Sequence, residues 1–291
     1  MPLVDIALPV YNGARFITQT LEGLLEQSVR DLRITVVDNA STDGTADAAD
    51  VVATREPRVR VFRRTHNAGS IDNFNYAMRL TDAPYVLWAS DHDVREPDYL
   101  ERCLTVLEAQ PDVVLCYTGA DWVGTDGQYL HDVHSVIDTR GLPPLGRLNV
   151  LLWGAGPYCY AIYGLMRRSA VEQLRSWPQP YPDVIAPDIV MLSELAMVGD
   201  FAFVPEKLFH LRRMHDYDDF DAYTQKLGKR ANSDSEALRL YARFLREMVA
   251  GVGPHAHSFP QALAGRTSAL TCGVINYRGL FSLLRDQAHA R

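Results

Sequence analysis

Cysteine is scarce in this sequence, and the few cysteines present follow no metal-binding or disulfide pattern. The 291 residues include no Cys-x-x-Cys pair and only four cysteines, Cys103, Cys116, Cys159 and Cys272. Zinc knuckles and disulfide-stapled secreted domains need regularly spaced cysteines, so neither class is indicated. A reducing compartment, the cytoplasm, is the expectation that fits best.

Long apolar stretches are also missing. The longest, such as residues 113–116, fall far short of the roughly 20 residues that a membrane-spanning helix needs. The first residues lack the basic start and the apolar stretch of a signal peptide, and they lead directly into a strand-like segment. We therefore expect a cytoplasmic protein, with any membrane contact limited to a peripheral one at the inner face.

An excess of positive charge is absent as well. Lys and Arg number 29 against 36 Asp and Glu, which gives a formal net charge of -7. Proteins that mainly bind nucleic acid are usually basic, so no nucleic-acid partner is expected. The chain is 47% hydrophobic, which excludes a disordered protein and is enough for a sizeable core.

Short β-branched runs alternate with helical patterns over the first 117 residues. The predicted strands are 4–8, 34–37, 59–62, 85–89 and 113–116. Between them, apolar residues recur at helical spacing in the segments 16–25, 45–55, 71–78 and 100–107. This alternation predicts a parallel sheet with helices on both faces.

The second half of the chain is less regular. Residues 118–160 are rich in Gly, Asp and Pro and are expected to be an irregular functional region. Helices are predicted from about Ser169 and near Asp188, and closing strands at 201–204 and 208–213. We expect one domain over residues 1–222, with a nucleotide-binding half at 1–117 and an acceptor half at 118–222.

Residues 223–291 are predicted to form a helical C-terminal region. A helical stripe runs through 235–249, and a last apolar cluster combines Val274-Ile275, Leu280-Phe281 and Leu283-Leu284. Packing of this cluster on its own domain is the first interpretation, because amphipathic helices usually face a core. A second subunit, giving a homodimer, or a peripheral contact with a membrane surface are the alternatives.

Polar residues follow each of the first four strands at the point where the strand ends. In an open α/β sheet, ligands bind beyond the carboxyl ends of the strands, so these groups should converge on one edge. They are Pro9-Val10-Tyr11-Asn12-Gly13, the segment Asp38 to Gly44, the segment His66 to Gly69, and Ser90-Asp91-His92-Asp93.

The acidic residues in this set each admit two interpretations. Taken alone, Asp91 and Asp93 fit a solvated turn. A carboxylate pair at the end of a buried parallel strand, however, suits Mg²⁺ or Mn²⁺, which prefer oxygen ligands and bridge to phosphates. Asp38 fits a turn or a helix cap, or else a contact with a base or ribose.

Together these ordered motifs resemble the inverting family 2 glycosyltransferases of the GT-A fold, which use nucleotide-diphosphate sugars. The resemblance covers about residues 3–215. It implies an α/β, Rossmann-like GT-A domain with a mostly parallel sheet and helices on both faces. The motifs that carry it are Leu8 to Gly13, Val36 to Thr45, Asn67 to Gly69 with Asn75, and Asp91-His92-Asp93 with Pro97.

The resemblance assigns roles to the residues at the sheet edge. Tyr11 would offer a ring face to the nucleotide base and Asp38 would accept from a base N–H. Asp91 and Asp93 match the D-x-D motif, in which the first acid lies near the ribose and the last binds Mg²⁺ or Mn²⁺ on the diphosphate. The other residues implied to contact the nucleotide are Pro9, Val10, Asn12, Asn67, Gly69 and His92.

The resemblance also implies a general base. In the family an acid-acid pair usually opens a helix in the second half, but Ala186-Pro187-Asp188 keeps only the second acid. Asp188 would accept the proton of the acceptor hydroxyl in a single in-line displacement, while the metal stabilises the departing diphosphate. The alternative is that Asp188 only caps its helix.

Aromatic and basic residues complete the implied site. Trp153 and Tyr158 lie where the family contacts donor and acceptor sugars, although aromatic pairs as often pack in cores. His215 would complete the metal shell, and Arg212 and Arg213 would pair with the diphosphate. A solvated acidic loop is the alternative for His215, because four aspartates follow it within residues 216–221.

Two other functions stay open at this point. A sugar-phosphate nucleotidyltransferase would want a Gly-rich basic loop after the first strand, where this chain has residues 11–15, Tyr-Asn-Gly-Ala-Arg. A catalytically silent nucleotide-sugar-binding scaffold is supported by Pro187, which replaces an acid. A dinucleotide oxidoreductase is not indicated, because no G-x-G-x-x-G follows a strand. The expected partners are a nucleotide-diphosphate sugar and an acceptor hydroxyl on a glycan, a glycolipid or a small molecule.

Overall fold

The structure is a computed structural model that describes residues 1–154, 160–175, 177, 184–214, 233–279, 281–282 and 285. Its first part contains β1 (Val4–Val10), α1 (Ile17–Leu25), β2 (Leu32–Asp38), α2 (Thr45–Arg55), β3 (Val59–Arg63), α3 (Ser70–Arg79), β4 (Tyr85–Trp88), β5 (Val94–Arg95) and α4 (Tyr99–Ala109). Its second part contains β6 (Val113–Val123), β7 (Tyr129–Asp132), α5 (Pro144–Gly154), β8 (Leu165–Arg167), α6 (Arg168–Val171), α7 (Pro187–Val198), β9 (Asp200–Arg212), α9 (Asp234–Val252) and α10 (Phe259–Asn276).

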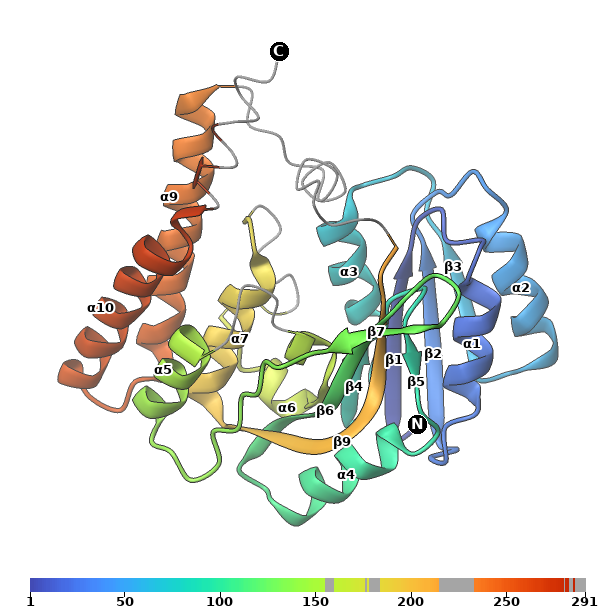
Figure 1. The fold of residues 1–291 in the computed structure, drawn as a ribbon, viewed down its shortest axis with the longest axis horizontal. Coiled ribbons are helices and arrows are strands. Elements are labelled where there is room, and N and C mark those ends of the chain that lie inside the picture. The colour runs from blue at the N-terminus through green and yellow to red at the C-terminus, as the bar shows by residue number, and fades with distance from the viewer. Residues whose placement is uncertain are drawn as a thin grey trace.

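One mixed sheet forms the centre of the molecule, with strand order β3-β2-β1-β4-β8-β6-β9-β5 and β7 paired to β6 (Figure 1). The first four strands are parallel, as predicted. All seven residues of β1 are buried, which is the burial that a near-continuous apolar strand of a parallel sheet requires. Beyond β4 the sheet becomes mixed, because β8 runs antiparallel to both β4 and β6.

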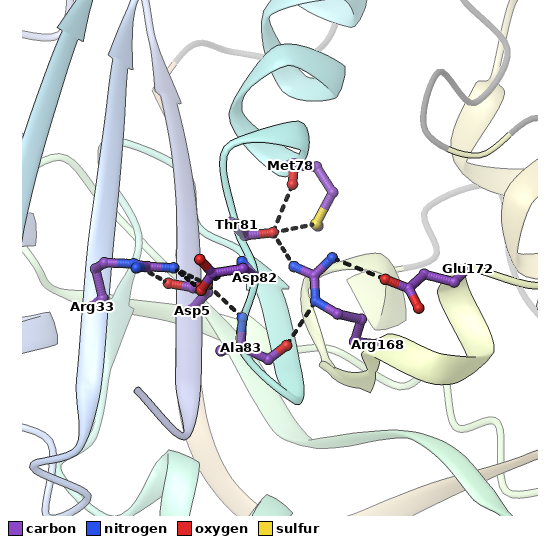
Figure 2. A network of polar contacts seen from close by, with 8 residues as sticks. All are labelled: Asp5, Arg33, Met78, Thr81, Asp82, Ala83, Arg168 and Glu172. Carbon is purple, nitrogen blue, oxygen red and sulfur yellow. Dashed lines mark hydrogen bonds and ion pairs between the residues drawn. The ribbon is translucent and has the colours of Figure 1, made fainter. Parts of the chain in front are cut away.

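A buried ion pair fixes the amino ends of these strands. Arg33 on β2 donates from Nε and Nη2 to the two carboxylate oxygens of Asp5 on β1, each at 2.6 Å. Asp5 Oδ2 also accepts from the backbone N–H groups of Asp82 and Ala83, and Arg168 Nε donates to the Ala83 carbonyl (Figure 2). A fully hydrogen-bonded ion pair fixes strand register here, at the edge opposite the ends of β1 and β2 that carry the predicted site.

Residues 118–154 are more regular in structure than their composition predicts. β6 continues to Val123, β7 pairs with it, and α5 occupies 144–154. The two predicted closing strands are one strand, β9, which runs parallel to β6 with register shifts around Gly119. A Cβ atom at Gly119 would lie 2.8 Å from the Pro205 carbonyl. The glycine therefore lets β9 bulge past a proline that the sequence pattern suggests is a break.

The C-terminal helices α9 and α10 pack on α7 and α5. Tyr241 donates to the Gly273 carbonyl at 2.7 Å, and Phe244 meets Tyr277 with ring centroids 5.5 Å apart. Of the predicted apolar cluster, Phe281 packs against Tyr241, whereas Val274 and Ile275 are half exposed. Leu280, Leu283 and Leu284 lie outside the described residues. Within the described part of the chain, every helix is too short or too polar to cross a membrane.

Candidate active site at the carboxyl edge of the sheet

The loops after β1 and β2 are hydrogen-bonded to each other. Asn12 N–H donates to Ser41 Oγ, and Asn12 Oδ1 accepts from the Thr42 N–H, both at 2.9 Å. Gly13 N–H donates to Thr45 Oγ1 at 2.9 Å. Asn12 has a left-handed φ of 53°, a conformation in which asparagine is enriched. Asn12 thus holds the two loops together rather than projecting freely toward a ligand.

Asp38 and Tyr11 differ in burial in a way that suits a base pocket. Asp38 is only 3% exposed, and its Oδ2 accepts from the Ser41 N–H at 3.1 Å. Its Oδ1 has no hydrogen-bond partner among the described residues, although buried polar atoms are nearly always paired. Tyr11 is 47% exposed and available for stacking. Pro9 and Val10 are buried within β1, directly beneath this loop.

Asn39 ties this edge to the loop before α3. Its Nδ2 donates to Asn67 Oδ1 at 2.8 Å and to the Gly69 carbonyl at 3.2 Å, and its Oδ1 accepts from the Ala68 N–H. Gly69 has a φ of 86°, which favours glycine. Asn67 and Gly69 are therefore brought to the predicted edge, and Asn39 holds them there.

The two acids of the predicted D-x-D motif are held in different environments. Asp93 is 5% exposed. Its Oδ1 accepts from the Arg212 N–H at 2.8 Å, and its Oδ2 accepts from Ser90 Oγ. Asp91 is paired instead with His92, whose Nδ1 lies 2.6 Å from Asp91 Oδ1. The backbone of β9 thus positions one acid, and the neighbouring imidazole the other.

Arg212, the last residue of β9, lies at the same place. Its guanidinium lies 4.2 Å from the Phe16 ring centroid and donates to Gln19 Oε1 at 3.1 Å. The pKa of the Arg212 guanidinium is lowered, mainly by burial and also by the positive charge of Arg15. The nearby Asp93 carboxylate raises this pKa but does not outweigh the lowering. A buried cation next to Asp93 is in reach of the D-x-D motif, as the sequence suggests.

Asp188 lies in the first turn of α7, after Ala186, whose φ of 46° is strained for alanine. Burial raises the pKa of its carboxyl above the ordinary aspartate value of 3.8, against two backbone hydrogen bonds that lower it. α7 runs into β9, so that its first turn faces the same side of the molecule as the carboxyl ends of β1 to β4 (Figure 1). A carboxylate with a raised pKa is a better base than an ordinary one.

The sequence of residues 5–175 matches the family model "Glycosyl transferase family 2". This match spans more than half of the chain. The chain belongs to glycosyl transferase family 2. The predicted family and the predicted enzyme class, a glycosyltransferase, are thereby confirmed.

Curated relatives resemble less than half of this family 2 chain. A chondroitin synthase of Pasteurella multocida is 30% identical over 130 residues, 45% of this chain and 13% of that protein. A chondroitin synthase of Escherichia coli is 33% identical over 118 residues, 40% of this chain and 17% of that protein. The similarity thus spans under one fifth of these longer relatives.

Solved structures share the fold over nearly the whole family 2 chain. A mannosyltransferase from Pyrobaculum calidifontis, in complex with GDP-Man and Mn²⁺, aligns with a TM-score of 0.56 and 20% identity over 97% of this chain and 75% of that one. S. aureus TarS 1-349 in complex with UDP-GlcNAc aligns with a TM-score of 0.55 and 13% identity over 99% and 93%. The predicted GT-A fold with C-terminal helices is confirmed.

Four predicted site residues of the family 2 chain need separate comment. Tyr158 and His215 lie outside the described residues. Trp153 is 46% exposed, but its indole N–H donates to Ser268 Oγ on α10 at 3.2 Å. Its contact is therefore with the C-terminal helices, and only its exposed ring remains for a sugar. Arg213 follows β9, where its N–H donates to the Val123 carbonyl.

Asn73 is a positioning residue that the motifs do not reveal. It is 2% exposed on α3, and its Nδ2 donates to the Val37 carbonyl at 2.9 Å and contacts the Val10 carbonyl at 3.5 Å. It therefore joins the ends of β1 and β2, from which Tyr11 and Asp38 project. The signal in the sequence is a polar residue on the inward face of a helix, which requires a buried partner.

Proposed function

We propose that this chain transfers a sugar from a nucleotide-diphosphate sugar to an acceptor hydroxyl by a metal-dependent, inverting displacement. The observation that carries the proposal is the unpartnered, buried Asp38 Oδ1, with the half-exposed Tyr11 directly after Val10, the β1 residue that pairs with Asp38. A buried acceptor without a partner is costly, and an N–H of a nucleotide base would satisfy it. The ring of Tyr11 would cover the same base.

The residues at the D-x-D motif fit a divalent cation. Both oxygens of Asp93 accept one hydrogen bond each from the protein, and a carboxylate has further lone pairs to offer a metal. Hard oxygen donors suit Mg²⁺ or Mn²⁺, and a bound cation of this kind would neutralise charge on the diphosphate. The described residues hold no group of three His, Cys, Asp or Glu that could bind a metal alone. Donor phosphates, water and His215, which lies outside the described residues, would supply the remaining ligands.

Arg212, Asp188 and Trp153 have separate roles in the proposed reaction. Arg212 would contribute positive charge near the diphosphate, in a site where burial strengthens electrostatic interactions. Asp188 would take the proton from the attacking hydroxyl, and its raised pKa suits that task. One displacement at the anomeric carbon, with attack opposite the leaving group, inverts its configuration. The exposed ring of Trp153 is left for the acceptor or donor sugar.

Experiments are needed to identify the nucleobase and the acceptor that this chain uses. The mannosyltransferase structure contains a GDP sugar and the TarS structure a UDP sugar, and one Asp with one Tyr serves either base. A glycan, a glycolipid and a small molecule are all candidate acceptors. The cytoplasm, where nucleotide sugars are made, is the proposed location.

Calorimetry with UDP and GDP in the presence of Mn²⁺ tests the base pocket. Asp38→Asn should weaken the preferred nucleotide about ten-fold or more, since a hydrogen bond to a charged group contributes about 1.5–3 kcal/mol. Asp31→Asn is the matched control, because Asp31 is exposed at the opposite edge of the sheet. Equal affinities for the parent and Asp38→Asn would remove Asp38 from the pocket.

Product analysis separates this proposal from its two competitors. Incubation with the preferred nucleotide sugar should release the nucleoside diphosphate slowly, and only with metal. Release of inorganic pyrophosphate from a nucleoside triphosphate and a sugar phosphate would instead identify a nucleotidyltransferase. Tight binding of the donor without release of either product would instead support a catalytically silent scaffold that binds nucleotide sugars.

A further inference from the structure

α10 differs from an ordinary surface helix in that its large apolar residues are exposed and small residues are buried. The residues that it buries against the protein are small, Gly265, Ala269, Cys272 and Gly273. Large apolar residues lie on its other side: Phe259, Leu263, Leu270 and Val274 are between 46% and 78% exposed. Their spacing of four, seven and four residues aligns them along one side of the helix. We call these four residues the outer stripe.

The charged side chains of the segment that contains the outer stripe have one sign. No Asp or Glu occurs between residues 248 and 285, although the chain of 291 residues has 36 acids and a net charge of -7. Arg266 and Arg278 are exposed beside the stripe, and Arg285 is exposed further along. Apolar side chains flanked by arginines on an otherwise acidic protein form a localised, complementary surface for an anionic apolar partner.

A second copy of the chain fits this face poorly. A two-fold dimer would lay the outer stripe on itself and bring the arginines of both copies together. With no acid in the segment to pair with them, this contact would be repulsive. A bilayer with anionic lipids accepts the apolar side chains and pairs with the arginines at once.

The surface continues into a shallow depression that includes one arginine, Arg278. A shallow cavity of about 730 Å³ lies at the carboxyl end of α10, lined by Tyr241, Val274, Asn276, Arg278 and Phe281 among others. Val274 belongs to both the stripe and the cavity. We propose that the outer stripe of α10, with Arg266 and Arg278, docks the protein on the surface of an anionic membrane.

The test is flotation of the full chain with lipid vesicles. Binding is expected to vesicles of equal parts phosphatidylcholine and phosphatidylglycerol, and little to phosphatidylcholine alone. Added salt should weaken binding. Arg266→Gln with Arg278→Gln should weaken it roughly five-fold for each arginine removed. Leu263→Gln with Leu270→Gln should weaken it further, since it removes the apolar contact.

Matched controls lie at the far end of the molecule. Val51 is 64% exposed on α2, and Arg60 is exposed on β3, both distant from α10 (Figure 1). Val51→Gln and Arg60→Gln should leave vesicle binding unchanged. The altered residues are all exposed, and unchanged melting temperatures would confirm that the variants fold.

Three outcomes would overturn the proposal. The first is that the parent fails to bind the mixed vesicles at low salt. The second is that the stripe variants and the controls bind the vesicles equally well. The third is that the parent is a dimer in solution and that Leu263→Gln with Leu270→Gln converts it to a monomer. The last would identify the stripe as a dimer interface. Donor turnover by the variants in free solution should equal that of the parent, so the proposal stands or fails separately from the proposed reaction.

Discussion

Gly13 and Asp91 lie against each other at the carboxyl edge of the sheet, so closely that a Cβ atom on residue 13 would be 2.1 Å from Asp91 Oδ2. The same Cβ would lie 2.7 Å from a methyl group of Val10. Residue 13 must therefore be glycine for the first acid of the D-x-D motif to keep its place. The loop after β1 and the loop after β4 are matched in shape to each other.

Gly13→Ala should consequently lower activity more than stability. The new methyl group would push the Asp91 carboxylate aside, and a misplacement of about 1 Å can cost on the order of 100-fold in rate. The measurement is kcat/KM for donor and acceptor, together with the melting temperature. Gly23→Ala on α1 is the matched control, because a Cβ there meets nothing within 4 Å. That control should keep full activity and gain up to about 1 kcal/mol of stability. Normal kcat/KM for Gly13→Ala would show that the contact is irrelevant to the reaction.

Asp93→Asn should abolish metal-dependent turnover, with a loss of at least about 100-fold. The fold should survive, because the amide oxygen can still accept from the Arg212 N–H and the amide nitrogen can donate to Ser90 Oγ. Mn²⁺ titration of the parent and the variant in the presence of nucleoside diphosphate measures the effect. Asp31→Asn again serves as the control. Full parent activity in excess EDTA would refute the metal requirement.

Much of the fold and of this edge could be predicted from the sequence, because parallel strands leave a simple pattern. β1, β2 and β4 are buried along their whole length, so each appears in the sequence as an apolar run. Because these strands are parallel, the polar residues that follow them meet at one edge of the sheet. Asp38, Asp91 and Asp93 could be proposed on that ground alone. The relation between strands and loops is local, so a single sequence contains it.

The second half was predictable only in part, because its structure depends on distant pairing. Pro205 and Gly119 look like strand breaks in isolation, yet β6 and β9 pair across them through a bulge. The bond from Trp153 to Ser268 joins residues 115 positions apart. No pattern within one segment indicates such a contact. From the sequence, Trp153 therefore fits a sugar contact or core packing, and the bond from its N–H to α10 is not foreseen.

Asp188→Asn should keep donor affinity while turnover falls by about 10²–10⁴-fold, the usual contribution of a general base. The pH dependence follows from the raised pKa. The base must be ionised to accept a proton, so activity is lost as the pH falls through its pKa. That loss should begin at a higher pH than an ordinary aspartate, with its value of 3.8, would give. Calorimetry and a pH–rate profile test both statements, and near-normal turnover by the variant would leave Asp188 as a helix cap.

His210 on β9 should make the stability of the fold decrease as the pH rises, whereas the activity that depends on Asp188 decreases as the pH falls. Its Nδ1 lies 2.7 Å from Asp121 Oδ1 on β6, and its Nε2 lies 2.9 Å from Glu96 Oε1, just after β5. Burial lowers the pKa of the imidazole, but the hydrogen bonds to the two carboxylates outweigh it, and the pKa is raised above the ordinary 6.5. Because the folded pKa is the higher one, the stabilisation is fully present below about 6.5 and is lost as the pH rises through the folded value.

The experiment compares urea unfolding of the parent and His210→Gln across that range. Below the ordinary histidine pKa, the variant should be less stable by about 1 kcal/mol, a value kept low because nearly half of the Glu96 side chain is exposed. The difference should shrink as the pH rises, since the neutral imidazole loses its advantage over glutamine. His257→Gln is the control, because His257 is exposed beyond α9. A stability difference that is constant with pH would mean that His210 contributes packing and neutral hydrogen bonds, and not a charge held between Asp121 and Glu96.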